Sequence, residues 1–168
     1  KKNKTMRNKF LKIVLPAMLA LFALSCSEES NMDPEGQWSL SSPTVISPAE
    51  GASIVLNEAT PSTKVDFTWS GASSTAEYGV YYSVVIDSID SENFDTPILE
   101  VKASNSGKAL TASIAYNLLD EALSLAGYPA NAVANVKWAV KASCLSRATY
   151  DVAEIAIKRF EHEIIPGS

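Results

Sequence analysis

The segment KVDFTWS, at Lys64–Ser70, alternates strictly between polar and apolar side chains. Its apolar members are Val65, Phe67 and Trp69, which share one face of a strand because successive side chains point to opposite faces. One buried face and one solvated face are typical of an antiparallel sheet. The segment therefore predicts a half-buried antiparallel strand that contributes aromatic side chains to a core.

Similar strand patterns recur on both sides of this segment, separated by turn-forming residues. The stretch TVISPAEGASIVL, at Thr44–Leu56, holds two apolar runs around Pro48, which predicts an edge strand broken by a turn. Further strands are predicted at 78–87, 97–103, 134–144 and 150–160. About seven short strands with regular turns favour an all-β fold, an antiparallel β-sandwich of the immunoglobulin or fibronectin III type.

The hydrophobic period changes only in SIAYNLLDEALSLAGY, at 113–128, which predicts one short helix inserted between strands. Gly127 lies where a C′ glycine would end this helix, and Pro129 prevents its continuation. The apolar residues at helical spacing are Leu118, Leu119, Ala122, Leu123 and Ala126.

The three tryptophans have two different settings. Trp69 and Trp138 lie on the apolar faces of predicted strands, so we expect them in the core and not on a glycan-binding platform. Trp38 lies in a polar segment, where it either docks on the domain or contacts a ligand.

The sequence offers little for catalysis or metal binding. Its only histidine, His162, lies in the C-terminal tail, whereas nucleophilic catalysis needs a histidine held in a cleft. Asp87, Asp90, Glu92 and Asp95 crowd one loop, which is either a solvated loop or, less commonly, a calcium site. The sequence therefore predicts no enzyme, no cofactor and no metal centre, and it leaves calcium binding by this loop open.

The N-terminus has the features of a lipoprotein signal peptide over residues 1–25. The apolar run Ile13–Leu24 is twelve residues long, short of the about 20 residues that cross a membrane, and basic residues precede it. The sequence ALSC, at Ala23–Cys26, resembles the lipobox of bacterial lipoproteins, in which the cysteine is acylated and becomes the first residue. We expect Cys26 to be lipidated and to anchor the protein; the alternative is a soluble protein released by ordinary signal peptidase.

After the signal peptide, the sequence predicts three parts. Residues 26–42 are polar and contain proline and glycine, which predicts a lipidated flexible tether. Residues 43–161 form the sandwich, and residues 162–168 are a tail or the start of a linker. Six of the 14 basic residues and none of the 19 acidic residues precede Cys26, so the mature net charge is −11. This charge excludes nucleic acid as a favoured partner.

Four segments, in order, resemble the N-terminal domain of the SusE family. They are the stretch that ends in VDFTWS, then VYYSVVIDSIDSENFDTP, then the predicted helix, and finally VKWAVKAS. Glu28 and Glu29, close behind Cys26, resemble the surface-export signal of Bacteroidota lipoproteins.

The resemblance implies an outer-membrane, cell-surface lipoprotein of a Bacteroidota polysaccharide-utilisation locus. It also implies that this immunoglobulin-like domain is mainly a spacer that projects glycan-binding modules, so no sugar-binding residue is assigned. Polysaccharide or oligosaccharide and a SusC/SusD-like transporter are the implied partners. The alternative is an interaction module that contacts the transporter and binds no sugar itself.

Overall fold

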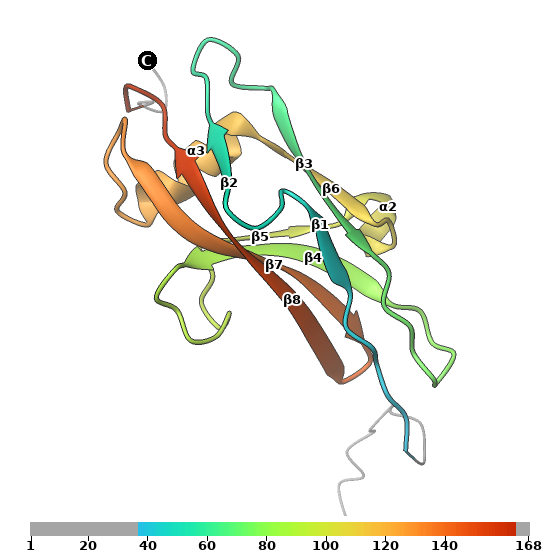
Figure 1. The fold of residues 1–168 in the computed structure, drawn as a ribbon. Coiled ribbons are helices and arrows are strands. Elements are labelled where there is room, and N and C mark those ends of the chain that lie inside the picture. Colours follow the sequence, from blue (N-terminus) through green and yellow to red (C-terminus); the bar gives the residue numbers. More distant parts are fainter. Residues whose placement is uncertain (1–36, 164–168) are drawn as a thin grey trace, which may run out of the picture. The chain divides into compact units, whose positions relative to one another are not determined.

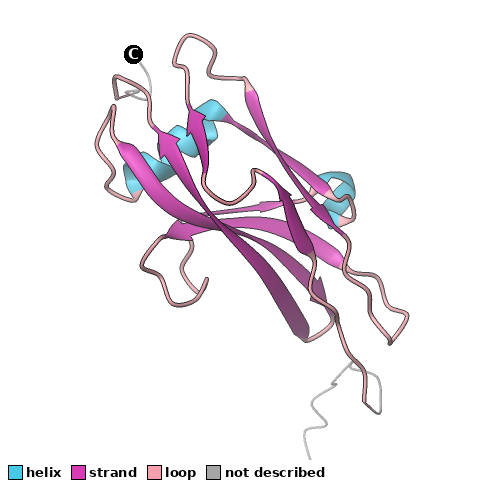
Figure 2. Cartoon of the chain, viewed as in Figure 1, coloured by secondary structure: helices cyan, strands magenta, loops and turns pink. Residues whose placement is uncertain are grey.

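The computed structural model describes residues 37–163 and shows a β-sandwich with two helices (Figure 1, Figure 2). The predicted signal peptide and the residues Cys26, Glu28 and Glu29 lie outside the described residues. The elements are β1 (Thr44–Ser47), β2 (Ala52–Val55), β3 (Lys64–Ser70), β4 (Tyr81–Ser88), β5 (Leu99–Lys102), α2 (Ser104–Gly107), β6 (Thr111–Ala115), α3 (Tyr116–Leu125), β7 (Val133–Cys144) and β8 (Arg147–Lys158).

The strands form two sheets, which confirms the predicted β-sandwich. The small sheet has the order β1-β3-β6 and the large sheet has the order β2-β8-β7-β4-β5. All pairs are antiparallel except β2 with β8, which is parallel. The described residues hold eight strands, because the predicted edge strand at 44–56 is two strands in different sheets and because β6 was not among the predicted strands. The turn around Gly51, whose φ is 75°, carries the chain from β1 to β2.

The helix is shorter than the sequence predicts. Residues 113–115 belong to β6, because they pair with β3 and the backbone is already extended there. The helix α3 then runs over Tyr116–Leu125, with Leu119, Ala122 and Leu123 buried but Leu118 partly exposed. The predicted C′ glycine is confirmed: Gly127 has φ 90°, and its N–H and that of Tyr128 donate to carbonyls in the last turn of the helix.

The core lies between the two sheets and is built around aromatic side chains. Trp69 and Trp138 are both fully buried, which confirms the prediction that they belong to the core. The ring of Phe67 meets Trp138 edge to face, with 4.9 Å between the ring centroids. The Trp138 Nε1–H donates to the Pro48 carbonyl at 3.1 Å, so this strand-to-turn contact also satisfies the indole.

Candidate functional site

The N-terminal end of the described chain is held on the sandwich by an arginine, in a contact called here the N-terminal clamp. Trp38 is buried, and the Arg147 guanidinium lies 4.5 Å from the centroid of its ring and donates to its carbonyl oxygen. Leu40 is also buried and forms a β-bridge with Ser74. Cys144, a buried free thiol, completes this small cluster. Residues 38–41, which were predicted to belong to the tether, therefore lie against the domain.

Trp38→Ala is expected to lower the free energy of unfolding by about 2 to 3 kcal/mol, because a buried aromatic side chain is removed. Trp38→Phe should lose less, since it keeps most of the apolar contact. A double-mutant cycle with Arg147→Met should give a coupling of about 0.5 to 1 kcal/mol for the cation–π contact. Urea unfolding measures Trp38→Phe and the four proteins of the cycle, and strictly additive effects in the cycle would show that the two side chains do not interact.

The opposite end of β8 carries a second arginine, in the C-terminal clamp. Arg159 is buried, and its Nε and Nη2 donate to the two Asp120 carboxylate oxygens at 2.9 and 2.8 Å. Its Nη1 and Nη2 also donate to Glu163, both at 2.9 Å, and Nη1 donates to the Tyr128 carbonyl. Bidentate pairing of this kind is both strong and directional, so it fixes the chain after β8 against α3.

Sequence reasoning missed this network, although one signal was available. Asp120 follows Tyr116 by four residues and precedes Leu123 by three, so it lies on the buried face of the helix. A carboxylate on a buried face needs a cation or several donors, because an uncompensated buried charge is costly. The partner could not be identified from the sequence, since Arg159 lies 39 positions away.

The C-terminal clamp also predicts a pH dependence of stability. The Arg159 guanidinium, and then the Ser124 hydroxyl, hold the pKa of Glu163 below its ordinary value of 4.5. A lowered pKa means that the folded state binds this proton less readily than the unfolded state. The resulting stability is therefore present above the ordinary pKa and is lost as the pH falls through the folded-state value.

We expect the free energy of unfolding to fall less steeply between about pH 5 and about pH 3 in Glu163→Gln than in the original protein. Urea unfolding at a series of pH values measures this slope. Glu92→Gln, in a different loop, serves as the control and should leave the slope unchanged. Equal slopes for Glu163→Gln and the original protein would contradict the assigned linkage.

The two clamps lie at opposite ends of one strand. Arg147 is the first residue of β8, and Arg159 directly follows its last residue, Lys158. The first and last of the twelve residues of β8 are eleven steps apart, so the strand spans about 36 Å at about 3.3 Å per step. The described chain therefore begins at one end of the sandwich and leaves near the other, as the course of β8 shows in Figure 1.

The acidic loop after β4 folds back over the outer face of the large sheet. The ring of Phe94 stacks on Tyr150 with 5.6 Å between centroids, and Lys137 Nζ lies 5.1 Å from the centroid of the Phe94 ring. Lys137 also donates to the Ser91 carbonyl. These contacts place Phe94 over the sheet between Lys137 and Tyr150, where the outward-facing Ala139 is fully buried. This loop, residues 87–95, is called here the strap, and an aromatic side chain holds it on the sheet.

One acidic side chain of this strap forms hydrogen bonds within the loop, and the acidic side chains do not form a metal site among the described residues. Asp87 is buried, and its two carboxylate oxygens accept hydrogen bonds from the Ser88 N–H at 2.8 Å and the Ser91 hydroxyl at 2.7 Å. In residues 37–163, the acidic side chains of the strap do not gather into a group of three potential metal ligands. The geometry therefore gives Asp87 a structural role at the start of the loop and adds no support for calcium binding.

Phe94→Ala is expected to lower the free energy of unfolding by about 1 to 2 kcal/mol, because a half-buried ring and its stacking partner are separated. Phe94→Leu keeps apolar area without the stack, so an intermediate loss is expected. Urea unfolding gives both values. If Phe94→Ala unfolds at the same urea concentration as the original protein, the strap is not held by this side chain.

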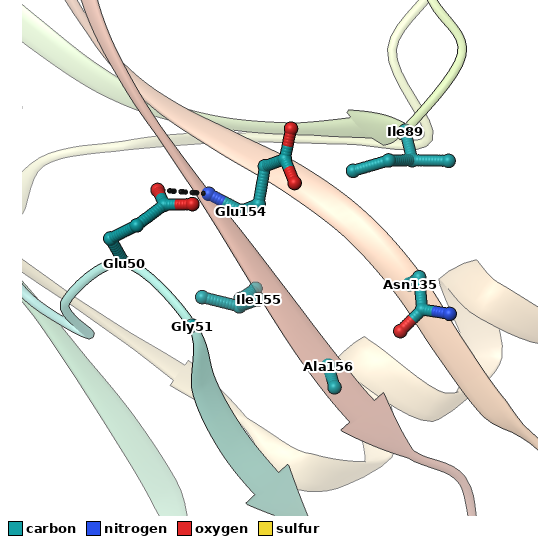
Figure 3. Close-up of a pocket in the computed structure, with 7 residues that line it drawn as sticks. All are labelled: Glu50, Gly51, Ile89, Asn135, Glu154, Ile155 and Ala156. Atoms are coloured by element: carbon teal, nitrogen blue, oxygen red, sulfur yellow. Dashed lines mark hydrogen bonds between the residues drawn. The ribbon is translucent and has the colours of Figure 1, made fainter.

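A shallow depression of about 440 Å³ lies on the outer face of the large sheet (Figure 3). At one edge of it, the Glu50 carboxylate accepts a hydrogen bond from the Glu154 N–H at 2.8 Å. Asn135 and Ile89 line the opposite side. The two glutamate carboxylates could accept hydrogen bonds from a polar ligand, and the Asn135 amide could donate or accept them. However, the side chains that line the depression include no aromatic ring on which a sugar could stack.

The surface of the domain does not identify a function, so the chain was compared with known proteins. Within residues 37–163, the structure contains no helix of the length and apolarity needed to cross a membrane. No curated protein and no solved structure matches the chain. A family model described as SusE outer membrane protein matches residues 28–141, which is more than half of the chain. The chain therefore belongs to the SusE outer membrane protein family.

Proposed function

We propose that this protein is a lipoprotein anchored in the outer membrane through acylated Cys26 and exported to the cell surface under the direction of Glu28 and Glu29. Its sandwich acts as a rigid spacer that projects glycan-binding modules of a polysaccharide-utilisation system, and it performs no catalysis itself. Membership of an outer membrane protein family supports the location. The predicted signal peptide, the lipobox-like sequence ALSC and the acidic pair support the anchor and the export.

One observation carries the spacer role: the described chain is clamped at both ends of β8. The N-terminal clamp fixes Trp38 beside Arg147, and the C-terminal clamp fixes Glu163 beside Arg159. A domain held in this way keeps the chain segments on its two sides apart by about the length of β8, about 36 Å. A flexible chain would give a broad range of separations instead.

Domain replacement in the source bacterium tests the spacer role. Residues 43–161 are exchanged for an unrelated β-sandwich with termini at opposite ends, or are deleted, and capture of labelled polysaccharide by whole cells is measured. If the domain is a spacer, the exchange should preserve capture of the polysaccharide and the deletion should reduce it. Loss of capture in both strains, with normal surface levels, would favour the alternative in which this domain makes specific contacts with a transporter.

Two variants test the anchor and the export separately. In Cys26→Ala, incorporation of a fatty-acid probe should be lost and the protein should leave the membrane fraction. In the double variant Glu28→Ser and Glu29→Ser, acylation should persist, whereas cleavage by protease added to intact cells should decrease. Membrane retention of Cys26→Ala would refute the lipid anchor, and unchanged cleavage of the double variant would refute the export signal.

A further inference from the structure

Three potential metal ligands meet at the end of the sandwich where the chain leaves β8. Glu58, in the loop between β2 and β3, lies beside Glu161 and His162, which follow the C-terminal clamp. One ligand atom from each residue lies within 4.8 Å of the other two. Sequence reasoning could not find this group, because Glu58 and His162 are 104 positions apart.

We infer that Glu58, Glu161 and His162 form a binding site for a divalent transition-metal ion of the zinc class. The ligand set indicates the class of ion: a neutral imidazole with carboxylates suits zinc and its neighbours, whereas magnesium and calcium prefer oxygen ligands alone. The two negative charges of the carboxylates, together with a neutral imidazole, also balance the two positive charges of a divalent ion.

The distances fit this assignment. The His162 Nδ1 lies 3.1 Å from Glu58 Oε1 and 3.2 Å from Oε2. Two ligands bound tetrahedrally to zinc at about 2.0 to 2.1 Å are about 3.3 Å apart, so Nδ1 and one Glu58 oxygen already have the required separation. A Glu161 carboxylate oxygen lies within 4.8 Å of a ligand atom of each of these two residues, and its exposed side chain can rotate toward the ion. The remaining coordination position faces solvent and would hold water.

The backbone on both sides of the site is held in place. The Phe160 N–H donates to the buried Asp120 carboxylate at 3.0 Å, and the His162 N–H donates to Glu58 Oε2 at 3.2 Å. On the other side, the Asn57 side chain accepts from the Ala59 N–H at 2.9 Å and so orders the loop around Glu58. The ligands therefore start close to a binding geometry, which reduces the entropy lost when the ion binds.

The surrounding charges leave this site open to a cation. Glu163, next to the site in sequence, is already paired with Arg159. In the part of the chain that the structure describes, neither Glu58 nor Glu161 forms an ion pair with a lysine or an arginine. A bound ion would join the loop between β2 and β3 to the segment after β8, and it would reinforce the exit of the chain from the domain.

Calorimetric titration of the full chain with zinc chloride tests the site. The protein is purified in detergent without a polyhistidine tag and with Cys26→Ser, so that any Cys26 left unacylated cannot bind zinc through its thiol, and it is first treated with EDTA. We expect one equivalent of zinc to bind, and we expect the affinity to fall by about tenfold or more in each of His162→Ala, Glu58→Gln and Glu161→Gln. Glu77→Gln, an exposed glutamate in another loop, is the matched control and should bind normally.

A second readout does not depend on heat signals. Because His162 is the only histidine in the sequence, its imidazole resonances in an NMR spectrum report on this site directly. One equivalent of zinc should shift them, whereas the same concentration of magnesium should not. The inference is overturned if zinc leaves these resonances unchanged, if binding survives in His162→Ala, or if Glu58→Gln and Glu161→Gln both bind like the control.

Discussion

Replacing Arg159 with methionine is expected to lower the free energy of unfolding by about 3 to 5 kcal/mol, one of the two largest effects of a single substitution in this domain. The reason is that the Asp120 carboxylate would remain buried without its cationic partner. Asp120 is as deeply buried as Arg159, and its carboxylate accepts hydrogen bonds from two of the arginine's nitrogens as well as from the Phe160 N–H. Without the guanidinium, a buried carboxylate would remain with only part of its hydrogen bonds.

Urea unfolding followed by circular dichroism measures this effect, and two further variants define its cause. The double variant Arg159→Met with Asp120→Leu removes both charges, so it should recover much of the lost stability. Lys141→Met breaks the partly exposed ion pair with Glu100, in which Nζ lies 3.3 Å from the carboxylate, and should cost less than about 1 kcal/mol. A loss below that level in Arg159→Met would show that the C-terminal clamp is not a stabilising contact.

Trp138→Ala is expected to cause a loss of similar size, about 3 to 5 kcal/mol, for a different reason. The indole is fully buried at the centre of β7, it meets the Phe67 ring edge to face, and it donates to the Pro48 carbonyl. Alanine removes all of these contacts and leaves a cavity that the surrounding strands cannot fill. Thermal or urea unfolding measures the loss, and a loss under about 1.5 kcal/mol would show that the core collapses around the cavity.

A pair of milder substitutions separates packing from hydrogen bonding in this core. The Trp69 Nε1 is buried and has no hydrogen-bond partner among residues 37–163, whereas the Trp138 Nε1 has one. Trp69→Phe therefore removes an unsatisfied donor, whereas Trp138→Phe leaves the Pro48 carbonyl without its partner. We expect Trp138→Phe to cost about 1 kcal/mol more than Trp69→Phe. The opposite order would show that differences in packing outweigh the hydrogen bond.

Local patterns in the sequence were sufficient to predict much of the fold. The alternation in Lys64–Ser70 correctly assigned Phe67 and Trp69 to the core, and the glycine at position 127 correctly marked the end of the helix. Both features depend on a few neighbouring residues, so they can be read without knowing the tertiary structure. The start of the helix was placed too early, because Ser113–Ala115 pairs with a distant strand that overrides the local period.

The sequence by itself determined the sandwich, the apolar faces of its strands and the features of a lipoprotein that lead to the proposal for Cys26. Only the tertiary structure decided which distant residues meet: Arg147 with Trp38, Arg159 with Asp120, and Glu58 with His162. The physical reason is that hydrophobic periodicity indicates which face of an element is buried, whereas nothing in the neighbouring sequence indicates which distant residue a charged side chain will pair with. The partners meet because the pairing of β7 with β8 and the packing of α3 bring each end of β8 beside chain segments far away in sequence.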